Sequence, residues 1–243
     1  AMLVAAVFGV LCVITGVRPM LGRALAAVGF ALMLSVAAFA IGDGTAAQAR
    51  RVAAAELERR AAQSLAQWDA NARTPEWRDL TARNPDLAEM EDRMREQLDA
   101  LPAAGIVALP AMLALETLAA LGLAWALFHR LSRTRIGPPL SRLREFRFND
   151  QLVWGLVVGI TLFVLPALAD LREAGINLIV FFGALYLLRG FGVLTWFLAP
   201  RGLALALLFA MVLLAPPLVG AAALWFGLGD TWFDWRSRPR STT

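Results

Sequence analysis

The chain has 243 residues, of which 59% are hydrophobic and 17% are charged, and its formal net charge is +4. The apolar share exceeds that of ordinary soluble domains, so much of the chain is expected to lie in lipid. The basic residues are arginines clustered beside apolar runs, which excludes the face-wide basic surface that nucleic-acid binding requires. The single cysteine, Cys12, excludes a disulfide framework.

Apolar runs of the length that crosses a bilayer, roughly 20 residues, recur along the chain. They cover about 1–17, 22–41, 103–128, 151–170, 176–198 and 203–228. The sequence therefore predicts an all-α polytopic membrane helix bundle of about six spans, with two spans in 1–41 and four in 103–228. The first run starts at Ala1 without a charged flank, so we interpret it as a span trimmed at its start and not as a signal peptide.

The arginines predict the orientation, because short cytoplasmic loops collect basic residues. Arg18 and Arg23 share one loop, and six arginines lie in the loop 129–150. Since two spans separate these loops, both are expected in the cytoplasm of a bacterial inner membrane, with 42–102 outside. The six arginines of the loop 129–150 are Arg130, Arg133, Arg135, Arg142, Arg144 and Arg147.

The C-terminal tail 229–243 conflicts with this assignment. Six spans place it outside, although it carries Arg236, Arg238 and Arg240. Either the tail is an exception to the rule, or one late apolar run does not fully cross. Pro216 and Pro217 are expected to kink or break the run 203–228, because proline removes a backbone donor.

The insert 42–102 holds 12 acidic and 9 basic residues and is therefore expected to face water. Its apolar residues recur at helical spacing in two stripes, which predict two amphipathic helices folded as a hairpin with a short helix between them. Thr74-Pro75 and Asn84-Pro85 resemble capped helix starts. The stripes either join the hairpin or form a partner-binding face. They consist of Leu57, Ala61, Leu65 and Trp68, and of Leu87, Met90, Met94, Leu98 and Leu101.

Charges inside apolar spans are the strongest functional indicators in a membrane protein, because each is costly unless it is paired or hydrated. Glu116 and Arg189 lie at similar depths in two parallel predicted spans, so we expect them to pair directly or through water. Such a pair either binds a polar ligand or locks two helices together. Tyr186 would share the face of Arg189, and Asn177 opens the same span. Glycines near Arg189, and Gly155-x-x-x-Gly159, permit close helix packing.

Motifs of enzyme chemistry are absent from the sequence. There is no nucleophile elbow, phosphate loop or His-Glu-x-x-His, and the single His129 makes a metal site improbable. Gly227-Leu228-Gly229-Asp230 reproduces a string of intramembrane aspartyl proteases, but that chemistry needs a second facing aspartate. No catalytic residue, metal or cofactor is therefore expected.

Arginines and aromatic residues that flank the spans predict contacts with the lipid interface. The segment 141–148 mixes both types directly before a span, which suits anionic headgroups. Tryptophans after the last span are typical of an aromatic belt. The predicted interface residues are Arg142, Arg144, Phe146, Arg147, Phe148, Trp154, Trp232 and Trp235.

Several strings in the second half carry a family resemblance. They are Phe146-Arg147-Phe148 with Gln151-Leu152-Val153-Trp154, then Gly175-Ile176-Asn177-Leu178, Leu185-Tyr186-Leu187-Leu188-Arg189-Gly190, and Asp230-Thr231-Trp232-Phe233-Asp234-Trp235-Arg236. In this order they resemble the YybS-like family of predicted bacterial membrane proteins. That family is distantly similar to substrate-binding subunits of energy-coupling-factor transporters and to the scaffold protein MreD, a likeness of fold that does not establish function.

Two functions remain open from the sequence. The first is a non-enzymatic transport subunit that binds a small molecule in a hydrated cavity between the third and fifth spans. The alternative is a scaffold or accessory subunit that docks other membrane proteins, or further copies of itself, through the insert and small-residue helix faces. Anionic lipids are expected partners of either, and nucleic acid is not.

Overall fold

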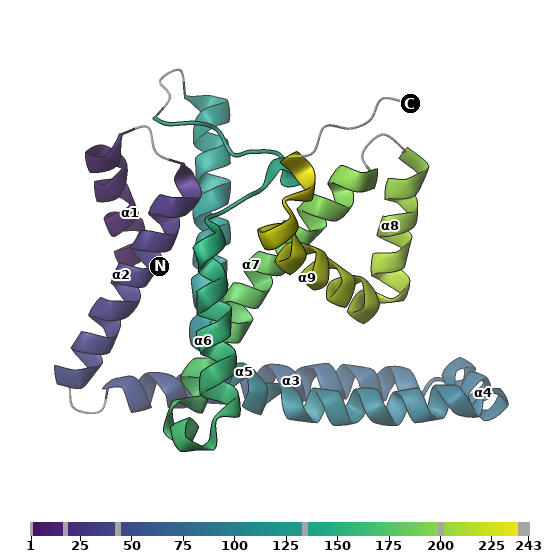
Figure 1. Cartoon of the computed structure of the whole chain (residues 1–243). Helices are drawn as coiled ribbons and strands as arrows, with labels where there is room; N and C mark the ends of the chain where they lie inside the picture. Colours follow the sequence, from purple (N-terminus) through teal and green to yellow (C-terminus); the bar gives the residue numbers. More distant parts are fainter. Residues whose placement is uncertain (1, 17–18, 42–44, 133–135, 199–201, 238–243) are drawn as a thin grey trace. The chain divides into compact units, whose positions relative to one another are not determined.

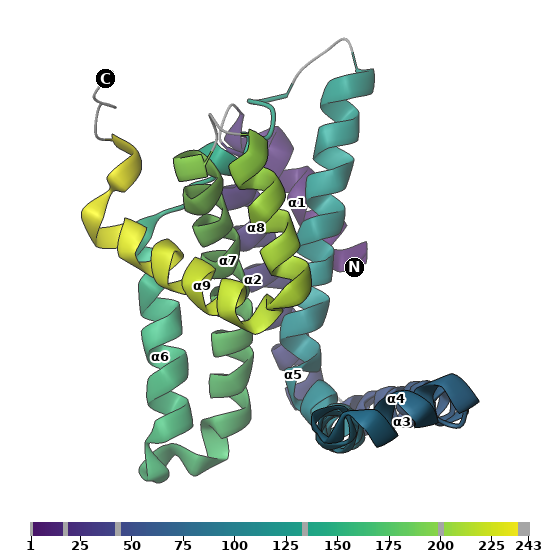
Figure 2. The ribbon, with the colours of Figure 1, turned by 90° about the vertical axis from the view of Figure 1, so that its right-hand side faces the viewer.

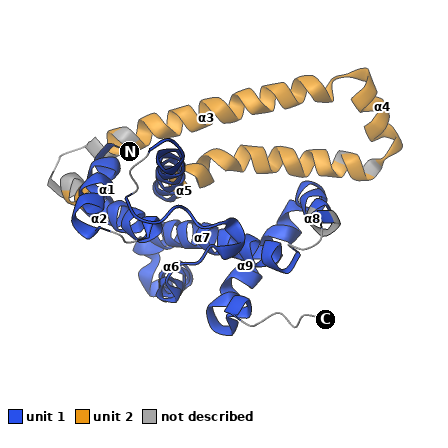
Figure 3. Ribbon diagram, turned by 90° about the horizontal axis from the view of Figure 1, so that it is seen from above, with its two compact units in different colours: residues 1–33, 110–243 blue, residues 34–109 orange. Residues whose placement is uncertain are grey.

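The computed structural model describes residues 2–16, 19–41, 45–132, 136–198 and 202–237 (Figure 1). Within these ranges all regular structure is helical, with nine α-helices and four short 3-10 helices. The chain divides into unit 1, 1–33 with 110–243, and unit 2, 34–109 (Figure 3). Five arginines named above lie outside the described residues: Arg18, Arg133, Arg135, Arg238 and Arg240.

Unit 2 is a long helical hairpin. It consists of α3 (Thr45–Ala72), α4 (Pro75–Arg83) and the first part of α5 (Pro85–Leu131), whose long arms run side by side in Figures 1 and 3. Arg95 of α5 is ion-paired with Asp69 of α3. The rings of Trp68 and Trp77 meet edge to face at 5.9 Å. This is the hairpin, with a short helix between its arms, that the apolar stripes predict.

The proline-started helices of the hairpin are present, but the predicted side-chain cap from Thr74 is wrong. Pro75 and Pro85 are the first residues of α4 and α5. The Thr74 hydroxyl donates to the Asn71 carbonyl instead of accepting from α4, and the Asn84 amide donates back to the preceding turn. Fixed proline geometry therefore starts α4 without a side-chain cap.

The third predicted span does not begin as a separate helix. It is the second part of α5, which continues without interruption through Pro102 and Pro110. An internal proline disturbs the hydrogen bonds of the preceding turn, and directly after Pro110 the backbone N–H of Ala111 donates to Oδ1 of Asn177 at 2.9 Å. A side chain from α7 (Arg172–Leu198) thus satisfies a backbone group beside the proline, as apolar surroundings require.

Unit 1 is built around α7. This helix packs against α6 and α9, and its middle also contacts the 143–145 turn (Figures 1 and 2). A second core joins α1, α2 and α5 through alanines of α2 and Trp125 of α5. The further helices of the unit are α1 (Met2–Thr15), α2 (Met20–Ile41), α6 (Val153–Val164), α7 (Arg172–Leu198), α8 (Gly202–Leu214) and α9 (Pro216–Phe233).

Two predicted spans are divided by prolines. The run 151–170 is helical in α6 only to Val164, because the residue before Pro166 is extended, and a 3-10 turn then leads directly into α7. The run 203–228 is broken at Ala215, before Pro216, into α8 and α9. The expected break at the proline pair is therefore confirmed.

Among the residues that the structure describes, two stretches are long and apolar enough to cross a membrane, one within α5 and one from Pro166 through α7. At about 1.5 Å per residue, the 12 residues of α6 rise only about 18 Å, whereas the hydrocarbon core is about 30 Å thick. The count of six spans therefore stays a prediction.

Glycines set the closest helix contacts of unit 1. A Cβ on Gly190 would lie 1.6 Å from the Ala223 carbonyl oxygen, and one on Gly227 would lie 1.9 Å from the Tyr186 carbonyl oxygen. Only glycine permits this approach between α7 and α9. On the other side of α7, Gly159 likewise packs against the backbone of α7. The close packing predicted for the glycines beside Arg189 and for the Gly155-x-x-x-Gly159 pattern is thus confirmed.

Candidate functional site

A buried arginine of α7, Arg189, lies at the centre of an ion-pair network in unit 1. Its Nε donates to Oδ2 of Asp230 in α9 at 2.9 Å, and its Nη2 donates to the Asp230 carbonyl oxygen at 3.2 Å. The two residues are only 3% and 1% exposed. The pair therefore joins α7 to α9 away from solvent, where an isolated charge would be costly.

Two further charged residues complete this network, which we call the Arg189 cluster: Arg189, Asp230, Asp150 and Arg236. Nη1 of Arg189 donates to Oδ1 of Asp150 at 2.6 Å. Arg236 follows α9 and donates to both carboxylate oxygens of Asp230, while its Nη1 donates to carbonyl oxygens of the segment 144–146. Two guanidinium groups thus face two carboxylates, and their formal charges cancel.

An aromatic wall closes one side of the Arg189 cluster. The guanidinium carbon of Arg189 lies 5.2 Å from the ring centroid of Phe148, a cation–π distance. Phe148 in turn meets the fully buried ring of Tyr186 edge to face at 5.1 Å. Tyr186 therefore lies beside Arg189, as its position one turn earlier in the helix predicts.

The predicted pair of Glu116 and Arg189 is wrong. The polar atoms of Arg189 bind Asp230 and Asp150, as described above, whereas Glu116 is exposed on α5. Similar depth along two helices does not determine which faces oppose each other. Aspartates that the sequence places at span ends lie closer to the arginine.

Asn177 links two helices instead of facing the Arg189 cluster. Its Oδ1 accepts from Ala111 of α5, and its Nδ2 donates to the Glu173 carbonyl oxygen at 2.8 Å. The third and fifth predicted spans are therefore joined at this amide. A joining polar contact between these two helices was expected, but not from this residue.

The predicted interface residues divide into two groups. Trp154 and Trp232 are 66% and 67% exposed, and the arginines at 142 and 144 are exposed as well, so all four are available to lipid. The others contact residues elsewhere in the chain: Arg147 pairs with Asp234 at 2.7 Å, Phe146 meets Phe148 at 5.9 Å, and Trp235 stacks on Phe233 at 5.5 Å. Arg144 pairs with its neighbour Glu145, and Arg147 is itself exposed.

A cavity of about 590 Å³ lies between α5 and α7. We call it the α5–α7 cavity. Apolar side chains line it, among them Leu118 of α5 and Ala184 and Leu185 of α7. The loop before the 143–145 turn borders it through Pro138, whose carbonyl oxygen accepts from Trp125 Nε1 at 3.1 Å. The loop is thereby tied to α5.

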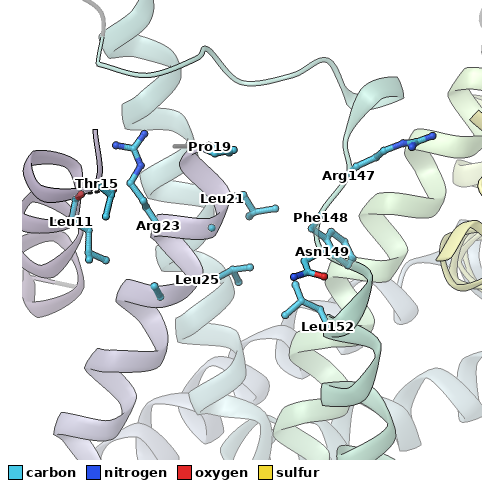
Figure 4. A pocket seen from close by; sticks show the side chains of 12 residues that line it. Leu11, Thr15, Pro19, Leu21, Arg23, Leu25, Arg147, Phe148, Asn149 and Leu152 are labelled. Carbon is cyan, nitrogen blue, oxygen red and sulfur yellow. Dashed lines mark hydrogen bonds between the residues drawn. The ribbon is translucent and has the colours of Figure 1, made fainter. Parts of the chain in front are cut away.

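A second cavity of about 550 Å³ lies between α2 and the segment 147–152 and shares Pro19, Leu21 and Arg147 with the first. We call it the α2 cavity. Figure 4 shows the Asn149 amide directed toward α2, whereas the Arg147 side chain extends away from α2. Four leucines, together with Thr15 and Arg23, are among the other residues that line it. The two neighbouring cavities are therefore mostly apolar, with a few polar groups in their walls.

The chemistry available to these sites follows from their composition. The Arg189 cluster is internally neutral and hydrogen-bonded, which suits a structural lock between helices. In the described ranges, no three His, Cys, Asp or Glu side chains gather where they could hold a metal ion. The cavities, by contrast, offer apolar surface with a few hydrogen-bonding groups, the usual composition of a small-molecule site.

The described residues form a helical protein with two stretches long and apolar enough to cross a membrane, and one of these, α7, carries the central arginine of an internal ion-pair cluster. Residues 80–231 match a family described as "Predicted membrane protein (DUF2232)". Since the match covers more than half of the chain, the chain belongs to the DUF2232 family of predicted membrane proteins. Comparison with curated proteins gave no match, and neither did comparison with solved structures.

Sequence reasoning missed Asp150, Asp230 and Arg236 as site residues. Asp230 lies after the predicted span 203–228, but α9 continues to Phe233 and buries it. One signal in the sequence is that a buried arginine in an apolar helix needs carboxylates. Asp230 lies within a string that carries the family resemblance, and Asp150 lies between two of them.

Proposed function

We propose that the chain is a multi-pass protein of the bacterial cytoplasmic membrane that binds an amphipathic small molecule within its helix bundle, as a non-enzymatic transport subunit of the YybS-like kind. The α5–α7 cavity carries this proposal. Its volume of about 590 Å³ falls within the range of roughly 300–1,000 Å³ usual for ligand pockets. Membership of a predicted membrane protein family supports the location.

The lining defines the class of ligand. The α5–α7 cavity is bordered mainly by leucines, prolines and alanines, so a hydrated polar solute would lose its water without compensation. The neighbouring α2 cavity adds the Asn149 amide and the Thr15 hydroxyl. A long apolar body with one polar end fits both cavities better than the hydrated ligand expected from Glu116 and Arg189.

The proposed topology keeps the orientation inferred from the arginines. The loop 129–150 lies in the cytoplasm, and the unit 2 hairpin lies outside. Anionic headgroups then meet exposed Arg142 and Arg144. In this topology the α8–α9 pair, broken before Pro216, turns back without crossing, because Arg236 and Asp234 after α9 bind Phe146 and Arg147 of the cytoplasmic segment.

Binding of a fluorescent long-chain fatty acid to the purified protein in detergent tests this function, with the matched fatty alcohol as a second probe. Ala184→Phe places a ring in the α5–α7 cavity and should weaken binding of both probes about tenfold. Ala174→Phe is the matched control, because this alanine is exposed on the same helix and does not line the cavity. Equal binding to the protein and to both variants would overturn the proposal.

A scaffold or accessory role is the second candidate. The observation in its favour is the set of exposed apolar side chains on the three helices of unit 2, since such residues on a charged hairpin suit a docking surface. They include Val52, Leu80, Met90 and Leu101. Polar replacement of Val52 and Met90 together should release a docked partner during gentle purification, without changing probe binding. Retention of the partner by that variant would argue against docking through the hairpin.

A further inference from the structure

Glu116 is the most isolated charge of α5. The sequence has no charged residue between Asp99 and Glu116, and none between Glu116 and His129. At about 1.5 Å of rise per residue, it lies on the order of 20 Å from each of these neighbours along the helix. The surrounding helix is long and apolar enough to cross a membrane. A carboxylate at such a depth is costly unless something pairs with it.

The face that carries Glu116 is turned away from the core of unit 1. Met112 and Leu123, one and two turns from Glu116, are 54% and 63% exposed. The core side of the same helix is formed by Leu118, Leu121 and other residues, which are less than 10% exposed. The surface that we call the Glu116 face comprises Met112, Glu116, Ala120, Leu123, Ala124 and Leu127, all exposed.

Within the part of the chain that the structure describes, no exposed arginine lies at this depth to complement Glu116. Arg189 is committed to Asp230 and Asp150, as described above. Arg23 is 3% exposed, and its guanidinium lies 4.9 Å from the Trp125 ring centroid. In the apolar helices of the described ranges, the exposed arginines are at helix ends. A second copy would therefore offer no accessible arginine opposite Glu116.

We infer that the Glu116 face docks a transmembrane helix of a different membrane protein, and that this helix carries a lysine or arginine at the depth of Glu116. In lipid, the Glu116 carboxylate and the basic side chain of the partner would each neutralise the other. Ala120 and Ala124 follow Glu116 at successive intervals of four residues and are exposed, so they allow the partner backbone to approach closely. This inference is independent of the proposed ligand in the α5–α7 cavity.

Photo-crosslinking in the membranes of the source cells tests the inference. A photoreactive residue replaces Ala120, and the same residue replaces Leu213 of α8 as the control, because Leu213 is also strongly exposed, at 68%. The photoreactive residue at position 120 should give at least tenfold more crosslinked adduct than the one at position 213. Its partner peptide should be an apolar span with one central lysine or arginine.

Charge exchange then decides whether Glu116 is the cause. Glu116→Lys should reduce the adduct at least tenfold, Glu116→Asp should retain it, and replacing the partner's basic residue by glutamate should restore it with Glu116→Lys. An unchanged thermal midpoint checks that the variants fold. Adducts only with lipid, only with a second copy, or with a span lacking a basic residue would each overturn the inference. An adduct insensitive to Glu116→Lys would do so as well.

Discussion

Arg189 and Asp230 are 41 positions apart in the sequence, and in the structure the guanidinium of the first donates to the carboxylate of the second at 2.9 Å. Gly190 and Gly227 lie beside them and bring the backbones of α7 and α9 together. The ion pair and the glycines thus act at the same crossing. Close packing excludes water, and exclusion of water makes each charge dependent on the other.

Loss of either charge of this pair should destabilise the protein strongly. Arg189→Leu leaves Asp230 with Arg236 alone, and Asp230→Leu leaves Arg189 with Asp150 alone. Each should lower the free energy of unfolding by about 1.5–3 kcal/mol, the range of hydrogen bonds to charged groups. The double variant should cost less than the sum of the two, since it removes both charges. Denaturant titration in detergent measures the coupling.

The exposed pair Arg147–Asp234 is the matched control, because its side chains are 41% and 50% exposed. Arg147→Gln should change the free energy of unfolding by at most about 1 kcal/mol. If the Arg189 and Arg147 variants lose similar stability, the buried pair is not the main lock between α7 and α9.

Gly190→Ala should separate α7 from α9. Its new Cβ would lie 1.6 Å from the Ala223 carbonyl oxygen, which belongs to backbone and cannot rotate away. We expect a loss of about 1–3 kcal/mol, typical of overpacking. Gly183→Ala in the same helix meets nothing within 4 Å, and it should be neutral or gain up to about 1 kcal/mol of helix propensity. Equal thermal midpoints for the two variants would contradict this account of the crossing.

Local patterns predicted the elements of this fold more accurately than the contacts between them. Apolar runs, the hairpin stripes and the break before Pro216 depend on neighbouring residues, and they are present in the structure. The partner of Arg189 depends on helix rotation. Periodicity within one helix does not determine how that helix is rotated against its neighbours. The sequence therefore favours Glu116 over Asp230 as the partner of Arg189.

The boundary between the insert and the third span shows a second limit of sequence reasoning. Pro102 and Pro110 favour separate helices when read locally, yet α5 is continuous. The acceptor beside Pro110 comes from Asn177, which is 66 positions from Ala111. Tertiary compensation of this kind has no local signature.

Asn177→Leu should weaken the link between α5 and α7. It removes the acceptor of the Ala111 N–H, and we expect a loss of about 0.5–2 kcal/mol, the range of polar contacts between membrane helices. Thr161→Val is the control, because its hydroxyl donates only to the Val157 carbonyl of its own helix. Hydrogen exchange at Ala111 should accelerate in the first variant alone. Unchanged exchange there would show that Asn177 does not protect this amide.

Glu56 provides a test in unit 2 that depends on pH. Its carboxylate accepts from Arg59 Nε at 2.9 Å and from Arg60 Nε at 2.7 Å, and these bonds lower its pKa from 4.5 to about 2. The unfolded chain therefore binds this proton more readily than the folded chain. Any stabilisation from Glu56 is complete above about pH 4.5 and is lost as the pH falls toward 2.

A pH titration followed by the carboxyl-carbon NMR signal of Glu56 in the labelled protein should give this low midpoint. Arg59→Gln and Arg60→Gln should each raise it, whereas Arg73→Gln at the far end of the hairpin should not. The side chains of Glu56, Arg59 and Arg60 are all exposed to solvent. Added salt should therefore screen their attraction and raise the titration midpoint of Glu56 toward 4.5. A midpoint that stays low in both arginine variants would place the cause elsewhere than in these hydrogen bonds.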